Sequence, residues 1–387
     1  MIKSIELFSG TGGLALGLQQ AGFSHVALVE RDARSCENLQ SNIDAGACEA
    51  VKGWHVFHSD VRAIDFTSYE GEVQMVSGGP PCQPFSLGGK ARAHEDCRDM
   101  FPEAVRAVRE IKPKAFVFEN VKGLLRKSFS SYFNYILLQL EYPEIVAVPG
   151  MTWQDHLSSL ERCHTSAPRQ TLRYNVAFRL LNTADYGVPQ KRERVVIVGF
   201  RSDVDARWNF PEGTHSEALL AYAQWVSGIY WEAHGMARPS CCPLSPVRLD
   251  AIRREAGCLF DKQRWRTVRD AWVGLSDPVE MDSEIPDHLF RGWARSYPGH
   301  SGSLMDAPSK TVKAGAHGVP GGENMICLDD GRMRYFTVRE AARLQTFPDN
   351  FTFSTSWTES MRQIGNAVPV RLAQVVGESV MGHLKEV

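Results

Sequence analysis

Apolar positions along the first 125 residues alternate between short continuous runs and runs with helical spacing. Short apolar runs bounded by polar residues or glycines are typical of buried strands, and apolar residues three and four positions apart are typical of helices. The pattern predicts strands at Ile2–Phe8, His25–Glu30, Trp54–His58, Val73–Val76 and Ala115–Phe118, and helices over the residues up to Gly22 and at Met100–Ile111. This alternation predicts a parallel sheet with helices on both faces.

Ligands bind such sheets outside the carboxyl ends of the strands. The residues that follow the predicted strands are polar or conformationally special, and they are the candidates for a functional site: Gly10, Glu30, Asp60, Cys82 and Glu119. We therefore expect one site at this edge.

The pattern changes in the second half of the chain. Two more strands are predicted at Tyr174–Leu181 and Arg194–Phe200, after which the periodicity is lost. Residues 201–330 are rich in tryptophan, proline and glycine, which predicts a second domain of irregular or short-stranded structure. Helical spacing returns at Phe336–Leu344 and Val368–Leu384.

Composition limits the class of protein. A chain of 387 residues that is 43% hydrophobic and 23% charged predicts an ordinary globular protein of two to three domains, at about 150 residues each. No apolar run is long enough for a membrane span, and a strand begins within a few residues of Met1, which leaves no room for a signal peptide. We therefore expect a cytoplasmic protein.

Charge and cysteine content add two expectations. Nine cysteines without any CxxC pair argue against disulfides and zinc ribbons, so no metal site is predicted. The net charge of −2 does not suggest a nucleic-acid binder, but residues 245–269 hold seven Lys or Arg against three acids. A local basic surface of this kind is enough to contact nucleic acid; the alternative is a solvated helix face.

The first turn has the sequence Phe8-Ser-Gly10-Thr-Gly12-Gly13, between a strand and a helix. Glycines there let a ligand approach the backbone closely, and Glu30 ends the next strand, where a carboxylate can bind ribose hydroxyls. Together with Asp60 this predicts a cofactor that contains adenosine. The turn alone does not distinguish a nicotinamide cofactor from S-adenosylmethionine, and a tight turn without a ligand is the simpler alternative.

Three further segments carry candidate chemistry. In GGPPCQPFS, prolines hold Cys82 on a stiff non-helical loop, which presents the thiol as a nucleophile rather than packing it. Glu119 in FENV follows a strand that ends at the same edge, where a partly buried carboxyl can hold a proton. In QKRER, Arg192 and Arg194 alternate with Gln190 on one side of an extended segment and could clamp an oxygen atom. Taken singly, the alternatives are a structural cysteine, a helix N-cap or turn role for Asn120, and a solvated charge run.

Together these segments resemble the DNA (cytosine-5) methyltransferase family. The motifs occur in order along the chain: FSGTGG, GGPPCQPFS, FENVKG, QKRER, TVREAARLQTFPD and QIGNAVP. The resemblance implies a Rossmann-like sheet for S-adenosylmethionine-dependent methyl transfer, formed by residues 1–200 and 335–387. It implies a smaller, irregular target-recognition domain at 201–334. With no long region before the first strand, the chain resembles the compact prokaryotic restriction-modification type.

The resemblance also implies a role for each matching residue. Cys82 would add to carbon 6 of a flipped-out cytosine in duplex DNA, Glu119 would bind ring nitrogen 3 and the exocyclic amine, and Arg194 with Arg192 would complete the catalytic set. The residues implied in cofactor binding are Phe8, Gly10, Gly12, Gly13, Glu30, Asp60, Pro80 and Asn366. Residues Gln83–Arg98 resemble the mobile loop that closes over DNA.

The resemblance implies two further properties, which are a monomer and a partner restriction endonuclease that acts on the same DNA site.

Three other functions fit part of the pattern. A tRNA cytosine-5 methyltransferase of the related eukaryotic type shares the Pro-Pro-Cys motif, but its Cys-Phe-Thr tripeptide is missing from this chain. A non-catalytic DNA-binding regulator would not need Cys82, Glu119 and Arg194 intact. A nicotinamide oxidoreductase explains the first turn but not the Pro-Pro-Cys segment.

Overall fold

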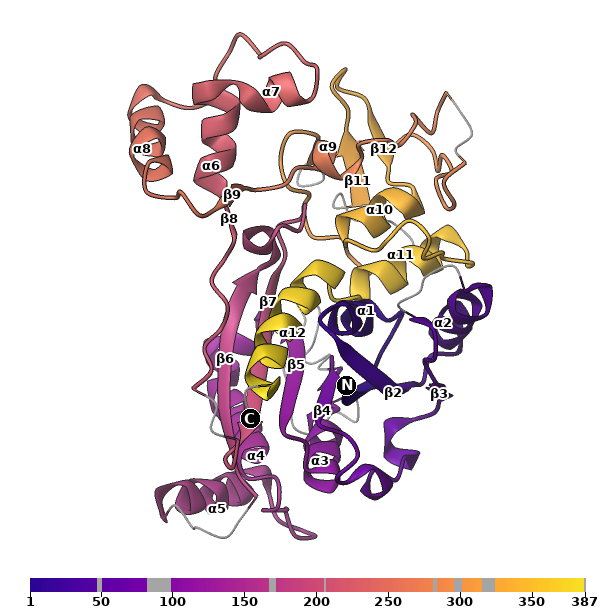
Figure 1. Ribbon diagram of the computed structural model, residues 1–387, viewed down its shortest axis with the longest axis vertical. Helices are drawn as coiled ribbons and strands as arrows, with labels where there is room; N and C mark the ends of the chain where they lie inside the picture. Colours follow the sequence, from indigo (N-terminus) through magenta and orange to yellow (C-terminus); the bar gives the residue numbers. More distant parts are fainter. Residues whose placement is uncertain are drawn as a thin grey trace. The chain divides into compact units, whose positions relative to one another are not determined.

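The computed structural model describes residues 1–46, 51–81, 99–166, 172–204, 207–280, 284–295, 301–314 and 324–385. The chain divides into two compact units (Figure 1). The first comprises Met1–Leu181, Glu193–Phe210 and Ala373–Val387, and the second comprises Asn182–Arg192 and Pro211–Leu372. No helix in the described ranges combines the length and apolar character needed to cross a membrane.

A seven-stranded sheet, in the order β3-β2-β1-β4-β5-β7-β6, forms the centre of the first unit. Its strands are β1 (Ile2–Leu7), β2 (Phe23–Glu30), β3 (Val56–His58), β4 (Met75–Gly78), β5 (Ala115–Val121), β6 (Tyr174–Asn182) and β7 (Glu193–Arg201). The helices are α1 (Gly13–Gln20), α2 (Ala33–Ala45), α3 (Phe101–Ile111), α4 (Ser130–Glu141), α5 (Trp153–Ser166) and α12 (Val370–Lys385). Every strand expected from the sequence is present, and the Rossmann-like α/β class is confirmed.

The sheet is parallel where the alternation over the first 125 residues predicts it, and antiparallel at the later strand β7. The first five strands pair in parallel, but β7 pairs antiparallel to β5, with Glu119 opposite Val196 and Val121 opposite Arg194. The chain between β6 and β7 is too short for the crossover helix that a parallel return requires. The first residues of β7 therefore lie beside the last residues of β5.

Helices cover both faces of the sheet, as predicted. Ile5 and Leu7 of β1 belong to one apolar core with α3 and α4. The intervening side chains of β1 point to the other face, where α1 packs. Helix α12 lies against α1, because a Cβ on Gly377 would be only 2.8 Å from Leu18 Cδ2.

Two buried titratable side chains fasten α1 to the sheet. The Glu6 carboxyl accepts the Ala15 amide and bonds the Ser77 hydroxyl at 3.2 Å. The His25 ring bonds the Ala15 carbonyl oxygen and the Ser4 hydroxyl, each at 3.0 Å. Burial raises the pKa of Glu6 to about 8 and lowers the pKa of His25 to about 4. Both groups are therefore largely neutral at pH 7.

The second unit contains two small sheets and several short helices. Its strands are β8 (His215–Ser216), β9 (Gln263–Arg264), β10 (Ser303–Leu304), β11 (Met325–Cys327) and β12 (Met333–Tyr335). Its helical segments include α6 (Glu217–Tyr222), η8 (Ala223–Ser227), α7 (Ile229–Ala233), α8 (Pro246–Ala256), α9 (Val268–Ala271), α10 (Val338–Leu344) and α11 (Trp357–Asn366). The expected short strands are present, but the helices between residues 217 and 256 were not anticipated.

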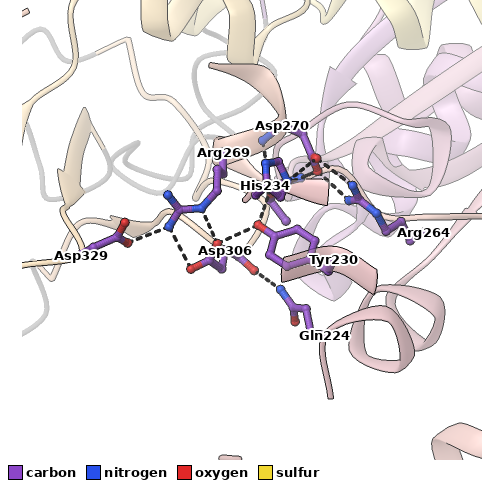
Figure 2. Close-up of polar contacts among 9 residues, drawn as sticks. Gln224, Tyr230, His234, Arg264, Arg269, Asp270, Asp306 and Asp329 are labelled. Carbon is purple, nitrogen blue, oxygen red and sulfur yellow. Dashed lines mark hydrogen bonds and ion pairs between the residues drawn. The ribbon is translucent and has the colours of Figure 1, made fainter. Parts of the chain in front are cut away.

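Two carboxylates organise the polar interior of the second unit (Figure 2). Asp270 of α9 accepts two bonds from Arg264, at 2.7 and 2.8 Å, and lies 3.0 Å from His234 Nε2. Asp306 accepts from Arg269 and from the Tyr230 hydroxyl, each at 2.7 Å. These bonds join α7, β9 and α9 to the segment that follows β10.

The boundaries between the units differ from those expected at residues 200 and 335. Residues 182–192 and 335–372 group with the middle segment. The contacts explain this, since the Arg334 guanidinium forms a buried ion pair with Glu340 of α10, at 2.6 Å. Returning periodicity located helix α10 but did not show what the helix packs against. The assignment of catalysis and DNA reading to separate parts of the chain remains a prediction.

Glu6→Gln should flatten the pH dependence of stability above pH 6.5. Because folding raises the Glu6 pKa from 4.5 to about 8, its neutral form contributes stability that is present below pH 4.5 and lost as the pH rises toward 8. The lowered pKa of His25 acts in the opposite direction, below pH 6.5. Between pH 6.5 and 8 the wild type should lose up to about 1.4 kcal/mol of unfolding free energy per pH unit through Glu6.

Urea unfolding at several pH values measures this slope. The control is Glu72→Gln, which neutralises an exposed carboxylate paired with Lys3 and should leave the wild-type slope in place. A Glu6→Gln protein that follows the wild-type curve over this range would contradict the account.

Candidate active site

The turn after β1 has a positive φ angle, in the left-handed region, at three residues. Phe8, Gly10 and Gly12 have φ angles of 55°, 53° and 81°. A Cβ on Gly12 would lie 2.9 Å from Leu39 Cδ2, whereas a Cβ on Gly10 would meet nothing within 4 Å. Gly12 is therefore needed for packing, and the space beside Gly10 is open. Gly13 begins α1 and is buried.

Glu30 joins the end of β2 to this turn. Its Oε2 accepts the amide of Gly10 at 2.8 Å, and its Oε1 accepts the amides of Arg31 and Asp32 at 2.8 and 2.7 Å. A carboxylate can accept about four hydrogen bonds. Three backbone donors hold the group in place and leave capacity for a ligand hydroxyl.

Asp60 follows β3 and caps a short helical turn, η2 (Val61–Ala63). Its carboxylate accepts the Arg62 amide at 3.0 Å and the Arg62 guanidinium at 2.9 and 2.6 Å. The Arg31 guanidinium lies 3.5 Å away. These bonds to Arg62 hold the pKa of Asp60 below its usual range.

The strand β4 ends where backbones approach closely. A Cβ on Gly78 would lie 2.6 Å from the Leu7 carbonyl oxygen, so only glycine fits beside β1. The carbonyl of Pro80 accepts the Asn120 amide at 2.9 Å. Cys82 and the predicted mobile loop, Gln83–Arg98, lie outside the described residues.

Glu119 and Arg194 form a buried ion pair across β5 and β7. Arg194 Nε lies 2.8 Å from Glu119 Oε1, with the side chains only 13% and 12% exposed. Burial lowers the pKa of Arg194, and Glu119 opposes that shift. The other carboxylate oxygen faces the chain that leads to Cys82, since a Cβ on Gly79 would lie 3.6 Å from it. A carboxylate beside a guanidinium offers an acceptor and a donor to the edge of a flat polar ring.

Arg192 lies in a different environment, within the second unit. Its guanidinium is buried and donates to the carbonyls of Val312, Gly365 and Ala367, at 3.0, 2.7 and 3.2 Å. Gln190 reaches the same segment by accepting the Val312 amide. These contacts are made to backbone, and they order the chain around Val312 and Gly365.

Asn366 is the last residue of α11, in the second unit. The carbonyls on either side of it, from Gly365 and Ala367, both accept from Arg192. Arg192 therefore fixes the backbone that carries Asn366.

Five parallel strands bring predicted site residues to one edge of the sheet. In the order β3, β2, β1, β4 and β5, the residues at or near the carboxyl ends of the strands are Asp60, Glu30, Phe8, Pro80 and Glu119. The structure joins Glu119 to Arg194 directly. No cluster of three or more His, Cys, Asp or Glu side chains that could hold a metal ion occurs among the described residues.

Sequence reasoning missed the part played by Asn120. The alternatives considered for it were a helix N-cap or a turn role, yet its buried amide holds Pro80, two residues before Cys82. Alternation along β5 was the available signal, because it turns Asn120 away from the side taken by Glu119.

The basic segment 245–269 divides into paired and unpaired cations. Three of its seven cations bond carboxylates: Arg253 with Asp250, Arg264 with Asp270, and Arg269 with Asp306 and Asp329. Arg248 and Arg266 are exposed and form no ion pair among those found in the described residues, whereas Arg254, which is also exposed, donates to the Asp250 carbonyl at 3.4 Å. These two are therefore the cations best placed to meet an external anion.

The chain is similar to known proteins over nearly its whole length. The model for "C-5 cytosine-specific DNA methylase" matches residues 2–143, 148–237 and 252–382. The Type II methyltransferase M.PspPI of Psychrobacter sp. (strain TA137) is 32% identical, over 98% of this chain and 79% of the relative. M.NgoMIV of Neisseria gonorrhoeae is 29% identical, over 99% and 98%. The fold is similar to S. pombe Dnmt2 methyltransferase, with a TM-score of 0.57 and 17% identity over 100% and 99% of the two chains.

Arg192→Met should destabilise the protein even without a ligand. The substitution buries three carbonyls without their donor, which should cost about 2–4 kcal/mol of unfolding free energy. Lys191→Met is the matched control, because Lys191 is half-exposed and pairs with Glu217, and it should cost less than about 1 kcal/mol. Chemical denaturation measures both, and equal losses in the two variants would contradict the structural role of Arg192.

Proposed function

The chain belongs to the C-5 cytosine-specific DNA methylase family, and from this premise we propose that it methylates one cytosine within a specific duplex sequence through a covalent Cys82 adduct. It is a DNA (cytosine-5) methyltransferase. The observation that carries the proposed mechanism is the Glu119–Arg194 ion pair, 2.8 Å apart, beside the backbone that leads to Cys82.

The pair is complementary to the polar edge of cytosine. We assign Glu119 to accept hydrogen bonds from the exocyclic amine and from ring nitrogen 3 when that nitrogen is protonated. Arg194 donates to the ring carbonyl oxygen. Both groups then stabilise the charge that develops when a nucleophile adds to the ring. Arg192 is assigned as a positioning residue, because its NH1 and NH2 groups donate to backbone carbonyls.

Cys82 supplies the nucleophile. Its thiolate forms a bond to carbon 6, and the displaced electron pair makes carbon 5 nucleophilic. When bound, S-adenosylmethionine supplies the methyl group that carbon 5 receives. Loss of the carbon 5 proton then expels the Cys82 thiolate and restores the ring. A base inside a duplex cannot be reached by these groups, so we infer that the cytosine is flipped out.

The residues at the sheet edge fit S-adenosylmethionine. Space is open beside Gly10, and Glu30 retains capacity for a ribose hydroxyl after accepting its three amides. Asp60 is assigned to the adenine amine and Phe8 to the adenine face. Gly12, Gly13, Pro80 and Asn366 complete the proposed cofactor set.

DNA reading is assigned to residues 201–334. The exposed cations Arg248 and Arg266 support this, since phosphate contacts position a duplex while other side chains read its bases. The named relatives are Type II methyltransferases, and this likeness supports the proposal that the chain protects DNA from a cognate endonuclease. We propose that it acts as a monomer.

A fluorinated substrate tests the role of Cys82. Fluorine at carbon 5 of the target cytosine cannot leave as a cation, so duplex DNA with 5-fluorocytosine should be methylated once and stay bonded to the enzyme. The adduct should require S-adenosylmethionine and survive denaturing electrophoresis, and peptide mapping should place it on Cys82.

Two serine variants control this experiment. Cys82→Ser should form little or no adduct, because a hydroxyl is far less ionised than a thiol, while Cys97→Ser should trap DNA like the wild type. An adduct on another residue, or full methylation by Cys82→Ser, would overturn the mechanism. If the protein transfers methyl groups to tRNA and not to duplex DNA, the result would favour the tRNA methyltransferase class.

The proposed reading surface predicts a salt effect. Arg248→Gln and Arg266→Gln should each weaken binding of duplex DNA and reduce the slope of log affinity against log salt by about 0.9 for one lost phosphate contact. Arg253→Gln is the control on the same stretch, because Arg253 already pairs with Asp250. Fluorescence anisotropy at several salt concentrations measures the slopes, and wild-type slopes in the first two variants would exclude this surface.

A further inference from the structure

The carboxylate assigned to the adenine amine already has a partner. Asp60 Oδ1 accepts the Arg62 amide and Arg62 Nε, at 3.0 and 2.9 Å, and Asp60 Oδ2 accepts Arg62 NH2 at 2.6 Å. Arg62 thus holds Asp60 in a forked contact with both oxygens, from two residues along the chain.

This contact occupies three of the roughly four positions at which the Asp60 carboxylate can accept a hydrogen bond. Each carboxylate oxygen accepts about two hydrogen bonds, and Oδ1 already has two. At Oδ2 the second contact is the long one to Arg31, at 3.5 Å. An arriving amine would therefore compete with a cation that binds the carboxylate more strongly than a neutral donor does.

We propose that Arg62 is an internal competitor for Asp60, and that adenine binds more tightly when Arg62 releases the carboxylate. The inference rests on the proposed function, which assigns Asp60 to the adenine amine. Release is feasible because the Arg62 side chain is 51% exposed and can turn into water. The Arg62 amide remains bonded to Oδ1, so the cap of η2 keeps Asp60 in place while the fork opens.

The contact also affects which purine is accepted. After the fork opens, Asp60 can accept from an amine at purine position 6. With the fork closed, a purine that carries a carbonyl oxygen there meets the Arg62 donors instead. Removing Arg62 should therefore raise the affinity for a ligand that contains adenine. It should not raise the affinity for the same ligand with a carbonyl oxygen at purine position 6.

Calorimetry on the full chain tests the proposal, with S-adenosylhomocysteine as the probe. Arg62→Ala should bind it about two- to fivefold more tightly than the wild type at low salt, as expected for loss of an exposed ion pair. Arg31→Ala is the matched control, since it removes a nearby cation with only the 3.5 Å contact, and its affinity should stay within about 1.5-fold of the wild type. S-inosylhomocysteine should gain nothing from Arg62→Ala.

The outcomes separate this proposal from the proposed function. A wild type that does not bind S-adenosylhomocysteine would overturn the cofactor assignment itself. If the wild type binds and Arg62→Ala binds equally or more weakly, only the competition is overturned. An equal gain in Arg31→Ala, or for the inosine analogue, would reduce the effect to net charge and also overturn it. Unchanged thermal unfolding of Arg62→Ala confirms that the comparison is between folded proteins.

Discussion

The buried ion pair between Glu119 and Arg194 is the contact on which the proposed chemistry depends. Two charges taken out of water are costly, and the cost is offset only by close geometry and further hydrogen bonds. The 2.8 Å contact and the bond from Arg194 to the Glu193 carbonyl supply both. The pair thereby presents a desolvated hydrogen-bond donor and acceptor side by side, where the proposed mechanism places the polar edge of the cytosine ring.

The direction of β7 is what makes this pair possible. In the antiparallel pairing with β5, Arg194 near the start of β7 lies opposite Val121 at the end of β5. A parallel strand would carry the same arginine to the other edge of the sheet. The segment QKRER also divides its residues between the two units, because Gln190 and Arg192 bond within the second and Arg194 within the first.

The sequence was sufficient to predict the strands and the sheet edge at which the candidate site residues lie. Gly10, Glu30, Asp60 and Glu119 all follow short apolar runs, and the carboxyl ends of parallel strands converge. The direction of β7 could not be predicted from apolar spacing, because a buried strand has the same pattern in either direction. The partners of Arg192 lie more than 100 residues away, and the Arg62–Asp60 fork depends on side-chain rotamers. Neither leaves a periodic signal.

Bisulfite sequencing tests the central claim most directly. DNA would be taken from a host without cytosine-5 methylation, after expression of the wild type or of Glu119→Gln. The account predicts that expression of the wild type leaves one cytosine position, within a single recurring sequence, methylated and therefore resistant to bisulfite conversion. Expression of Glu119→Gln should leave that position methylated far less often. If the folded wild type methylates no cytosine, or if Glu119→Gln methylates the same position equally, the account is contradicted.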